Sequence, residues 1–362
     1  MTERSDSLIN DTRSIEDFKG LTFSLFKKSQ VKKTLFQSLS KGNLEESNYW
    51  VAEYICCGSY LDLWDTLLKY MSQHIHLGNP RLPIYIAKRF QEFKNIALSD
   101  YVSNQIEMRN SKRIRQLFAE ITGVLCQSVK KHKLEFIKLE KQGEFDITNL
   151  SNKLKAPSTK YALEVLQEDD PKELFIAVNE LGFNLSREVK NTLVACYWIE
   201  WILAFEGACK KKKEKCVCAK RDHMPVEGDG MFDVIFIVWD TIMKEVKNRN
   251  DKKLEEILKN LCQLFCIRYS VSSKKKRKIL LYHAVTLLCE NINYNINVFE
   301  NISVLQLVKN KIDLIYKQIK KNEIVESEEI LRNRELEQQI KNNKNFENTV
   351  TKLKIMNNND IL

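Results

Sequence analysis

The residues best suited to chemistry lie in one short segment after an aromatic, apolar run. Cys209, Cys216, Cys218 and His223 supply three thiols and an imidazole, a set that can bind zinc in tetrahedral geometry. Their spacing lacks the two-residue gap that normally lets one turn present two sulfurs to the same metal. The neighbouring lysines favour thiolates, which suits either metal binding or redox reactivity. The alternatives are a zinc site, a reactive thiol pair and an inert basic loop. We favour the inert loop, and hence no bound cofactor.

Basic residues gather in three segments and form a second set of candidate binding residues. The chain has a formal charge of +10, and residues 109–133, 206–222 and 268–278 carry +6, +4 and +6, which leaves −6 for the remainder. Concentrated positive charge is what a surface for polyanions needs. The candidate nucleic-acid contacts are Arg109, Lys112, Arg113, Arg115, Lys210, Lys211, Lys212, Lys213, Lys274, Lys275, Lys276, Arg277 and Lys278. Because no base-reading module accompanies them, we expect contacts to phosphates without sequence preference.

The helix dipole divides these basic residues into two groups. Lys210–Lys213 follow a predicted helix, and positive charge stabilises the negative C-terminal end of a helix. Lys274–Lys278 precede a predicted helix at residues 279–289, and Arg109–Arg115 begin another, so both runs would face a positive helix end. We expect these two runs to need an anionic partner. For Lys274–Lys278 the alternatives are a nuclear-import signal and a solvated loop.

Composition and apolar spacing predict an all-α protein. The 362 residues include only 10 glycines and 5 prolines, so few hairpin turns can be built. Apolar residues recur at helical spacing, as in Leu61, Trp64 and Leu68. We expect an irregular helical bundle or stacked helical hairpins, with a long C-terminal helix from about Val304 to Asn343.

Residue type marks several helix ends. The sequence Asp170-Pro171-Lys172-Glu173 predicts a helix start, with aspartate as the cap and proline in the first turn. Gly182 is expected to end that helix. Ser186 is expected to cap the next one, which runs through the aromatic stretch to about Ala208. The tryptophans expected in the core are Trp198, Trp201 and Trp239.

Composition divides the chain into four parts. A polar stretch with one proline near residues 149–159 marks a boundary between two helical units. The predicted parts are a flexible N-terminus at 1–20, an N-terminal helical domain at 21–150, a second helical domain with the basic cysteine-containing loop at 151–300, and a long charged helix with a Lys/Asn-rich tail at 301–362.

Cysteine usage and missing motifs narrow the compartment and the class of function. The ten cysteines, most of them among apolar residues, and the polar N-terminus predict a reducing compartment. The longest apolar runs reach about 14 residues, short of the roughly 20 that a membrane span needs, so we expect no transmembrane segment. The sequence holds no phosphate-binding glycine loop, no H-E-x-x-H motif and no G-x-S-x-G motif. We therefore expect no enzyme activity and no small-molecule substrate, and we expect the histidine-bearing corner His74–Pro83 to be a packed turn.

Three strings of sequence resemble one viral protein family. They are NYWVAEYICCGSYLDLWDTLLKYMSQHIHLGNPRLPIYI at 48–86, DPKELFIAVNELGFNLSREVKNTLVACYWIEWIL at 170–203 and KKKKEKCVCAKRD at 210–222. The chain resembles a family of uncharacterised helical proteins of giant nucleocytoplasmic DNA viruses, the mimivirus-like group, over roughly residues 48–292. The resemblance brings no activity and no functional residue with it. It implies a protein made in host cytoplasm and used in the viral factory or packed in the virion, with the nucleus as the alternative location.

Two functions follow as hypotheses. The first is a non-catalytic helical scaffold or subunit of viral factory or virion assemblies, which acts through protein partners. The alternative is a sequence-nonspecific nucleic-acid-binding accessory factor in viral replication or transcription. The placement of Arg113, Lys212 and Lys276 separates the two, because only the second hypothesis needs the basic segments on one face.

Overall fold

Helices provide all the regular secondary structure of the described chain. The computed structural model describes residues 6–102, 104–140, 145, 150–325, 340 and 344. The protein is 65% helical, and its described residues contain no β-strand beyond one isolated bridge between Leu21 and Lys27. The prediction of an all-α fold is confirmed, and its basis was the scarcity of turn residues together with helical apolar spacing.

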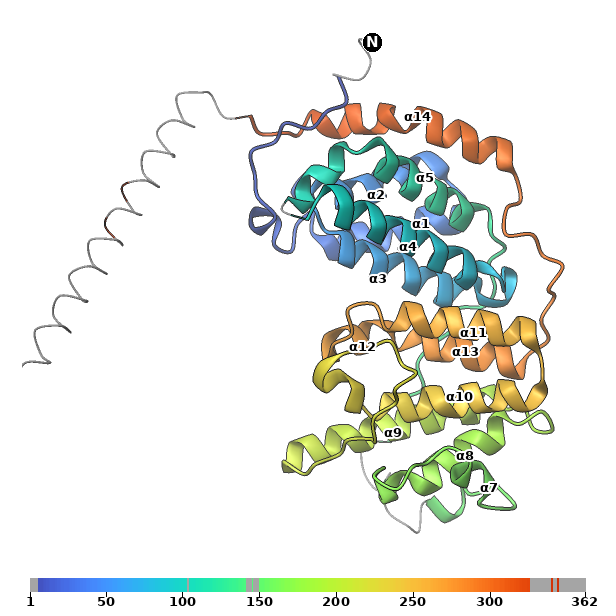
Figure 1. The fold of residues 1–362 in the computed structure, drawn as a ribbon. Helices are drawn as coiled ribbons and strands as arrows, with labels where there is room; N and C mark the ends of the chain where they lie inside the picture. The colour runs from blue at the N-terminus through green and yellow to red at the C-terminus, as the bar shows by residue number, and fades with distance from the viewer. Residues whose placement is uncertain are drawn as a thin grey trace, which may run out of the picture.

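The first lobe is built from the N-terminal helices and from the last helix of the described chain (Figure 1). Its members are α1 (Lys28–Lys41), α2 (Leu44–Cys56), α3 (Tyr60–Tyr70), α4 (Leu82–Asp100), α5 (Lys112–Gln127) and α14 (Ile302–Lys320). The chain leaves this lobe after α5 and returns to it only with α14, which packs on α5 and α2. The first lobe is therefore closed by residues from both halves of the sequence.

Close packing fixes α14 against α5. Gly123 of α5 lies where any side chain would collide with Leu305, since a Cβ atom there would stand 2.4 Å from the Leu305 Cδ2 atom. The predicted helix from Val304 to Asn343 is interrupted, because α14 ends at Lys320 and residues 321–325 are not helical, and nearly all of its remainder and of the Lys/Asn-rich tail lies outside the described residues.

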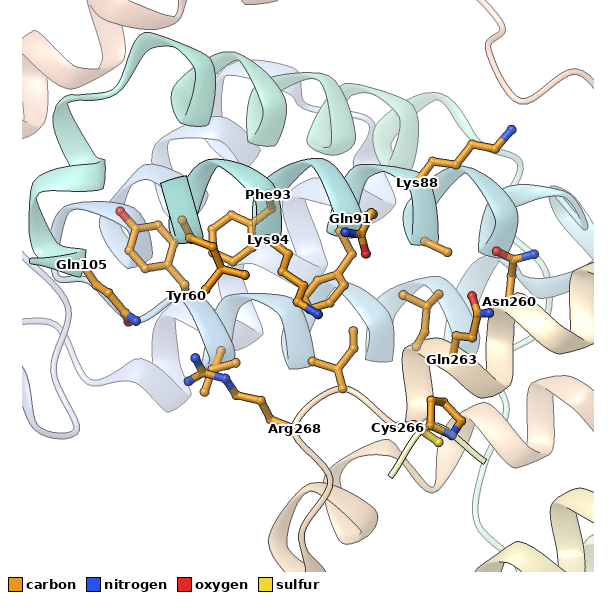
Figure 2. Close-up of a pocket in the computed structure, with 18 of the residues that line it drawn as sticks. Tyr60, Lys88, Gln91, Phe93, Lys94, Gln105, Asn260, Gln263, Cys266 and Arg268 are labelled. Carbon is orange, nitrogen blue, oxygen red and sulfur yellow. The ribbon is translucent and has the colours of Figure 1, made fainter. Parts of the chain in front are cut away.

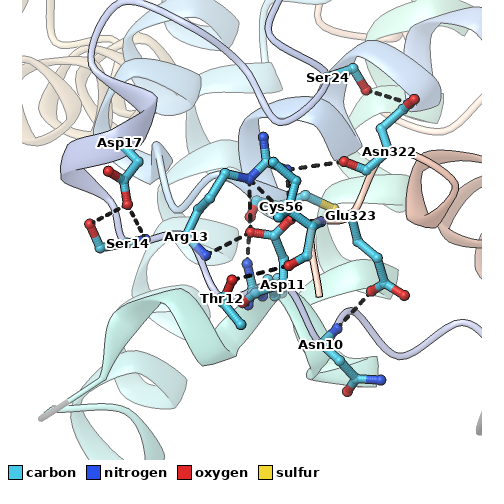
Figure 3. Close-up of polar contacts among 12 residues, drawn as sticks. Asn10, Asp11, Thr12, Arg13, Ser14, Asp17, Ser24, Cys56, Asn322 and Glu323 are labelled. Carbon is cyan, nitrogen blue, oxygen red and sulfur yellow. Dashed lines mark hydrogen bonds and ion pairs between the residues drawn. The ribbon is translucent and has the colours of Figure 1, made fainter. Parts of the chain in front are cut away.

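Residues 6–20 pack against the first lobe. Ile9 and Phe18 are buried, and the Asp11 carboxylate accepts a hydrogen bond of 2.7 Å from the Ile324 backbone N–H (Figure 3). The start of the chain is thereby tied to the segment that follows α14. Apolar side chains among residues 6–20 lie in the core, and residues 1–5 of the predicted flexible N-terminus lie outside the described residues.

The second lobe consists of the remaining helices, stacked in layers below the first lobe in Figure 1. They are α7 (Lys160–Leu163), α8 (Phe175–Leu185), α9 (Thr192–Lys212), α10 (Ile235–Arg249), α11 (Lys252–Phe265), α12 (Val271–Arg277) and α13 (Ile279–Cys289). Helix α11 packs on α4, α12 packs on α3, and α13 packs on α3, on the π-helical turn Met71–Ile75 and on the 3-10 turn His76–Gly78, and these contacts join the lobes. Helices α10, α9 and α8 follow on the far side.

The chain crosses between the lobes earlier than the composition suggested. Residues 128–140 run without helix from the end of α5 to the second lobe. The Leu134 N–H donates to the Gln73 carbonyl at 3.0 Å, and the Ile137 N–H donates to the Tyr282 hydroxyl at 3.1 Å. The crossing therefore precedes the predicted boundary near 149–159.

Helix α9 is the central helix of the second lobe. Trp198 and Trp201 on α9 and Trp239 on α10 are all buried, as predicted. Among the described helices α9 alone is long and apolar enough to cross a membrane, yet half of its apolar window is buried in the core. It also carries Glu200 and Glu206, each 2.7 Å from a lysine of the same lobe, which suits a core helix.

Three details of the helix ends predicted around α8 are wrong, although the helical segment does start at Lys172, where a 3-10 turn over residues 172–174 leads directly into α8 at Phe175. The expected cap is absent, because Asp170 is engaged with Arg221. Gly182 lies inside α8, where Tyr161 packs so closely that a Cβ atom would stand 2.8 Å from it. Asn191, and not Ser186, caps α9 by accepting from the Val194 N–H.

The corner at 74–83 is packed, as expected, and it buries one histidine against another from α13. His76 and His283 are fully buried, with ring centroids 6.3 Å apart. The His76 Nε2 atom lies 2.8 Å from the His132 carbonyl oxygen, and the His283 Nδ1 atom lies 3.2 Å from the Ser72 hydroxyl. Burial lowers the pKa of His76 to about 4 and that of His283 to about 3, because the interior disfavours the charged ring.

These two histidines predict a stability that depends on pH. Both have an ordinary pKa of 6.5, so between about pH 6.5 and pH 4 the unfolded chain binds more protons than the folded one. The contribution of the two neutral histidines to the free energy of unfolding should be fully present above pH 6.5. As the pH is lowered from 6.5, the free energy of unfolding should fall by up to roughly 1.4 kcal/mol per pH unit for each histidine. Urea unfolding at a series of pH values measures the slope, and His283→Gln should make it shallower whatever that variant does to stability at pH 7. An unchanged slope would contradict the burial of a neutral His283.

Candidate functional site

The candidate zinc ligands do not form a metal site. Among the described residues no group of three or more histidine, cysteine, aspartate or glutamate side chains is arranged to hold a metal ion. The Cys218 thiol is buried and donates to the Asp233 carbonyl at 3.2 Å, whereas His223 Nε2 lies 2.8 Å from the Asp240 carboxylate. Cys209 and Cys216 lie side by side at the end of α9.

The thiols of the basic loop are also poorly suited to redox chemistry. Burial and the neighbouring Cys209 raise the pKa of Cys216 to about 12. Burial likewise raises the pKa of Cys218 to about 12. Both thiols therefore stay protonated at neutral pH, although a reactive cysteine needs a lowered pKa. Of the lysines near these thiols, Lys210 pairs with Glu206, and Lys211, Lys212 and Lys213 are exposed.

A buried arginine holds the basic loop to the body of the second lobe. Arg221 lies between two carboxylates, with its Nη2 atom 2.6 Å from Asp170 and its Nε atom 2.7 Å from Asp240. Asp240 then contacts His223 through its other oxygen at 2.8 Å. Because Asp170 is engaged by Arg221, it caps no helix. His223 belongs to the same cluster through its contact with Asp240.

The basic run at 274–278 lies between two helices, at the end of α12 and directly before α13. Ser270 and Ser273 form a capping box that starts α12 at Val271, so Lys274–Arg277 occupy its last turn. Positive charge stabilises that end of α12, but Lys278 is also the N-cap of α13, so the predicted conflict with the dipole of α13 remains and is offset by carboxylates such as Glu200. The sequence pattern missed this short helix because it holds few apolar residues.

Four of the five cations in this run have carboxylate partners inside the protein. Lys274 is buried between Glu206 and Asp233, at 2.7 Å from each. The other pairs of the run, with their closest distances, are Lys276 with Asp62 at 3.1 Å, Arg277 with Asp65 at 2.8 Å and Lys278 with Glu200 at 2.7 Å. Within this run, Lys275 is the one cation that has no ion pair in the described chain, and it is exposed. The anions that the run was expected to need are therefore supplied by the protein itself.

Two arginines of the 109–115 cluster are structural as well. Arg109 is buried and donates to the Asp11 carbonyl at 2.7 Å. Arg115 is buried, lies 2.8 Å from the Asp313 carboxylate of α14, and stacks over the Tyr316 ring at 3.9 Å. Their prediction as phosphate contacts is wrong, because neither guanidinium is open to solvent.

The candidate cations that do remain exposed are divided between the lobes. Lys112 and Arg113 lie in the first turn of α5, whereas Lys211, Lys212 and Lys213 end α9. Lys210 beside them pairs with Glu206 at 2.5 Å. Helices α11 and α13 lie between α5 and α9 in Figure 1, so the two exposed groups are separated by a layer of helices.

A different set of lysines surrounds a hollow in the first lobe. We call it the basic hollow; its volume is about 720 Å³, and its lining residues are Ser29, Lys32, Lys33, Phe36, Gln37, Ser40, Lys41, Lys69, Gln73, His74 and Lys133. The five lysines come from α1, from α3 and from the segment that crosses between the lobes. None of the described residues that line the basic hollow is acidic.

The lysines of the basic hollow have few acidic neighbours, although Asp65 and Asp62 lie close enough to Lys32 to favour its charged form. Lys32, Lys33, Lys41 and Lys69 have no carboxylate within ion-pair distance in the described chain, and Lys133 pairs only with exposed Glu135. Burial and the charge of Lys69 lower the pKa of Lys32. Such a cluster is stabilised when an anion binds.

Aromatic rings lie among these lysines. The Phe36 ring meets the His74 ring edge to face at 5.7 Å, and His74 stacks on Tyr70 at 5.0 Å. Burial, together with Lys133 and Lys69, lowers the pKa of His74. The basic hollow therefore combines positive charge with aromatic side chains, one of them a neutral imidazole.

Sequence reasoning missed the basic hollow although part of its signal was present. Residues 27–41 contain five lysines and no acidic residue. Lys33, Phe36 and Ser40 follow each other at intervals of three and four, which places them on one helix face. That Lys69 and Lys133 join them depends on how α3 and the crossing segment pack.

A second concave surface runs along α4, and we call it the α4 groove (Figure 2). Its volume is about 790 Å³, and its walls come from α3, α4, the end of α11 and the loop that follows α11. Phe90, Phe93 and Leu264 form part of its apolar floor, and Lys88 and Arg268 lie at its edge.

No protein-family model matches the chain, and neither a curated protein nor a solved structure matches it.

The ion pair between Arg277 and Asp65 predicts a sharp contrast between two aspartates of α3. The Asp65 side chain is 8% exposed and the Asp62 side chain 46% exposed, and both accept from the basic run. Asp65→Ala leaves a buried guanidinium without its counter-ion and should lower the free energy of unfolding by about 3–5 kcal/mol. Asp62→Ala should change it by less than about 1 kcal/mol. Urea unfolding followed by tryptophan fluorescence measures both.

A double variant separates lost charge pairing from lost packing. Asp65→Leu with Arg277→Met removes both charges and should recover most of the loss seen in Asp65→Ala. If Asp62→Ala and Asp65→Ala cost the same, the Arg277 pair is not a special contact between the lobes.

Proposed function

We propose that this protein is a non-catalytic nucleic-acid-binding factor that holds the phosphate backbone in the basic hollow without sequence preference. The observation that carries this proposal is the cluster of five lysines with no acidic residue in its described lining. Lys32 and Lys69 of the basic hollow are half-buried without an ion pair in the described chain, whereas most other buried or half-buried cations of the described residues have carboxylate partners. Lysine contacts to phosphates release counter-ions, which supplies affinity that does not depend on sequence.

The aromatic side chains favour a single strand over a duplex. Phe36 and His74 line the basic hollow beside Lys33 and Lys69. Bases of a single strand can stack on such rings while the lysines hold the backbone. A duplex keeps its bases stacked on one another and offers this site only phosphates. We therefore expect tighter binding of single-stranded DNA or RNA than of duplex DNA.

The scaffold function is a second candidate, and the α4 groove favours it. A scaffold needs a surface for protein partners, and exposed apolar residues such as Leu98 and Val102 lie along this groove. A role in viral factory or virion assemblies, in host cytoplasm, rests on the family resemblance. The nuclear alternative loses its main support, because most of the run at 274–278 is engaged within the fold.

Replacing three lysines of the basic hollow tests the proposal. Lys32→Gln, Lys33→Gln and Lys69→Gln together should weaken binding of single-stranded DNA at least tenfold at about 50 mM salt, since three phosphate contacts are lost. The dependence of the logarithm of affinity on the logarithm of salt should become shallower by roughly 0.7 per lost contact. Fluorescence anisotropy with labelled single-stranded and duplex DNA measures both effects.

A variant with the same change in net charge is the control. Lys19→Gln, Lys172→Gln and Lys252→Gln remove three exposed lysines outside the basic hollow and should leave binding nearly unchanged. Equal losses in the two triple variants would show that only net charge matters. Wild-type protein that binds no nucleic acid more tightly than about 10 μM at low salt would end the proposal.

A further inference from the structure

The α4 groove has an apolar floor that remains open to solvent. Leu98 is 59% exposed and Val102 is 70% exposed, and both line the groove together with Phe90 and Ala97 of α4. Isolated exposed apolar residues are common on protein surfaces, whereas a row of them along a concave surface marks a binding site. Exposure of this extent also differs from a closed small-molecule pocket, which buries most of its ligand.

Positive charge without partners borders this floor. Lys88, Lys94 and Arg268 are exposed, and none has a carboxylate within ion-pair distance in the described chain. No acidic side chain is present among the described residues that line the α4 groove. The nearby Arg89 on the same helix is paired with Glu92 at 2.8 Å. The three cations therefore complement a ligand that carries negative charge beside apolar groups.

The length of the α4 groove suits a helix. Its α4 lining runs from Ala87 to Leu98, which corresponds to about 17 Å at 1.5 Å per residue, or roughly three helical turns, and Val102 continues it beyond the end of α4. Gln91 and Gln263 on the edges supply amide groups that can bond to polar side chains of a ligand. Helices bind in apolar grooves through residues at i, i+3, i+4 and i+7.

We propose that the α4 groove binds an amphipathic helix of a partner protein, with an apolar face and acidic residues on both flanks. This inference rests on the scaffold candidate and is independent of polyanion binding in the basic hollow. The apolar face of the partner covers Phe90, Ala97 and Leu98, while its carboxylates pair with Lys88, Lys94 and Arg268. Both features are required, because the floor gives affinity and the border selects acidic partners.

Selection from a displayed library of helical peptides of about 16 residues tests the proposal. The library is enriched on the wild-type protein and depleted on the double variant Leu98→Glu, Val102→Glu, whose positions are exposed and hence tolerant. We expect the enriched peptides to be acidic and amphipathic. Their affinity should fall at least tenfold in that variant. The control variant Leu163→Glu, Leu193→Glu changes residues that are 68% and 72% exposed elsewhere and should bind normally.

Charge reversal gives a second readout. In Lys88→Glu, Lys94→Glu the acidic peptides should lose affinity, and peptides with lysine in place of their glutamates should gain it. The groove variants should bind single-stranded DNA as the wild type does, which separates this site from the basic hollow. Enriched peptides that ignore both groove variants would support a scaffold with a different surface and overturn the assignment to the α4 groove.

Two other outcomes would also overturn it. Failure to enrich any acidic amphipathic peptide, with tight binding of oleate that Leu98→Glu abolishes, would assign the α4 groove to an anionic lipid. Concentration-dependent dimerisation in sedimentation experiments, lost in Leu98→Glu, would assign it to a second copy of this chain.

Discussion

Arg277 joins α12 to α3 through an ion pair with Asp65 that is almost completely removed from water. The guanidinium also donates to the carbonyl oxygens of Phe265 and Ile267, so it links α3, the end of α11 and α12 at one point. A buried charge of this kind is costly unless every donor is engaged. This contact helps to fix the relative position of the two lobes together with the packing of α11 on α4 and of α13 on α3, since α3 and α12 belong to different lobes.

The neighbouring cations extend the same constraint into the second lobe. Lys274 is held between Glu206 of α9 and Asp233, and Lys278 pairs with Glu200 of α9 while its ammonium lies 4.2 Å from the centre of the Phe136 ring. Carboxylates on an otherwise apolar core helix therefore have a clear role, because they meet the cations of the next layer. A run that looked like a surface for nucleic acid is instead an internal connection between helices.

The distribution of unpaired charge then separates the structural surfaces from the functional ones. Cations that are paired with carboxylates of the protein, such as Arg115 and Arg221, stabilise the fold. Their charges are already engaged and cannot bind a ligand. The basic hollow and the border of the α4 groove differ because their cations have no such partners in the described chain. Both sites are formed only when elements distant in sequence come together. Each also depends on α3, which contributes Lys69 to one and Leu61 to the other.

The amino-acid sequence by itself determined the all-α class, the burial of the tryptophans of α9 and α10, and the position of lysines at the end of α9. These properties follow from spacing within a single helix, which is a local property of the chain. Tertiary structure alone decided which cations are free. Glu206 lies 68 residues from Lys274, and Asp65 lies 212 residues from Arg277, so no local pattern could reveal that these charges are paired. Tertiary packing also decided three further features. They are the return of α14 to the first lobe, the crossing at 128–140 and the convergence of Lys32, Lys69 and Lys133. Each is set by packing between segments that are remote in sequence, and such packing depends on the shapes of whole helices.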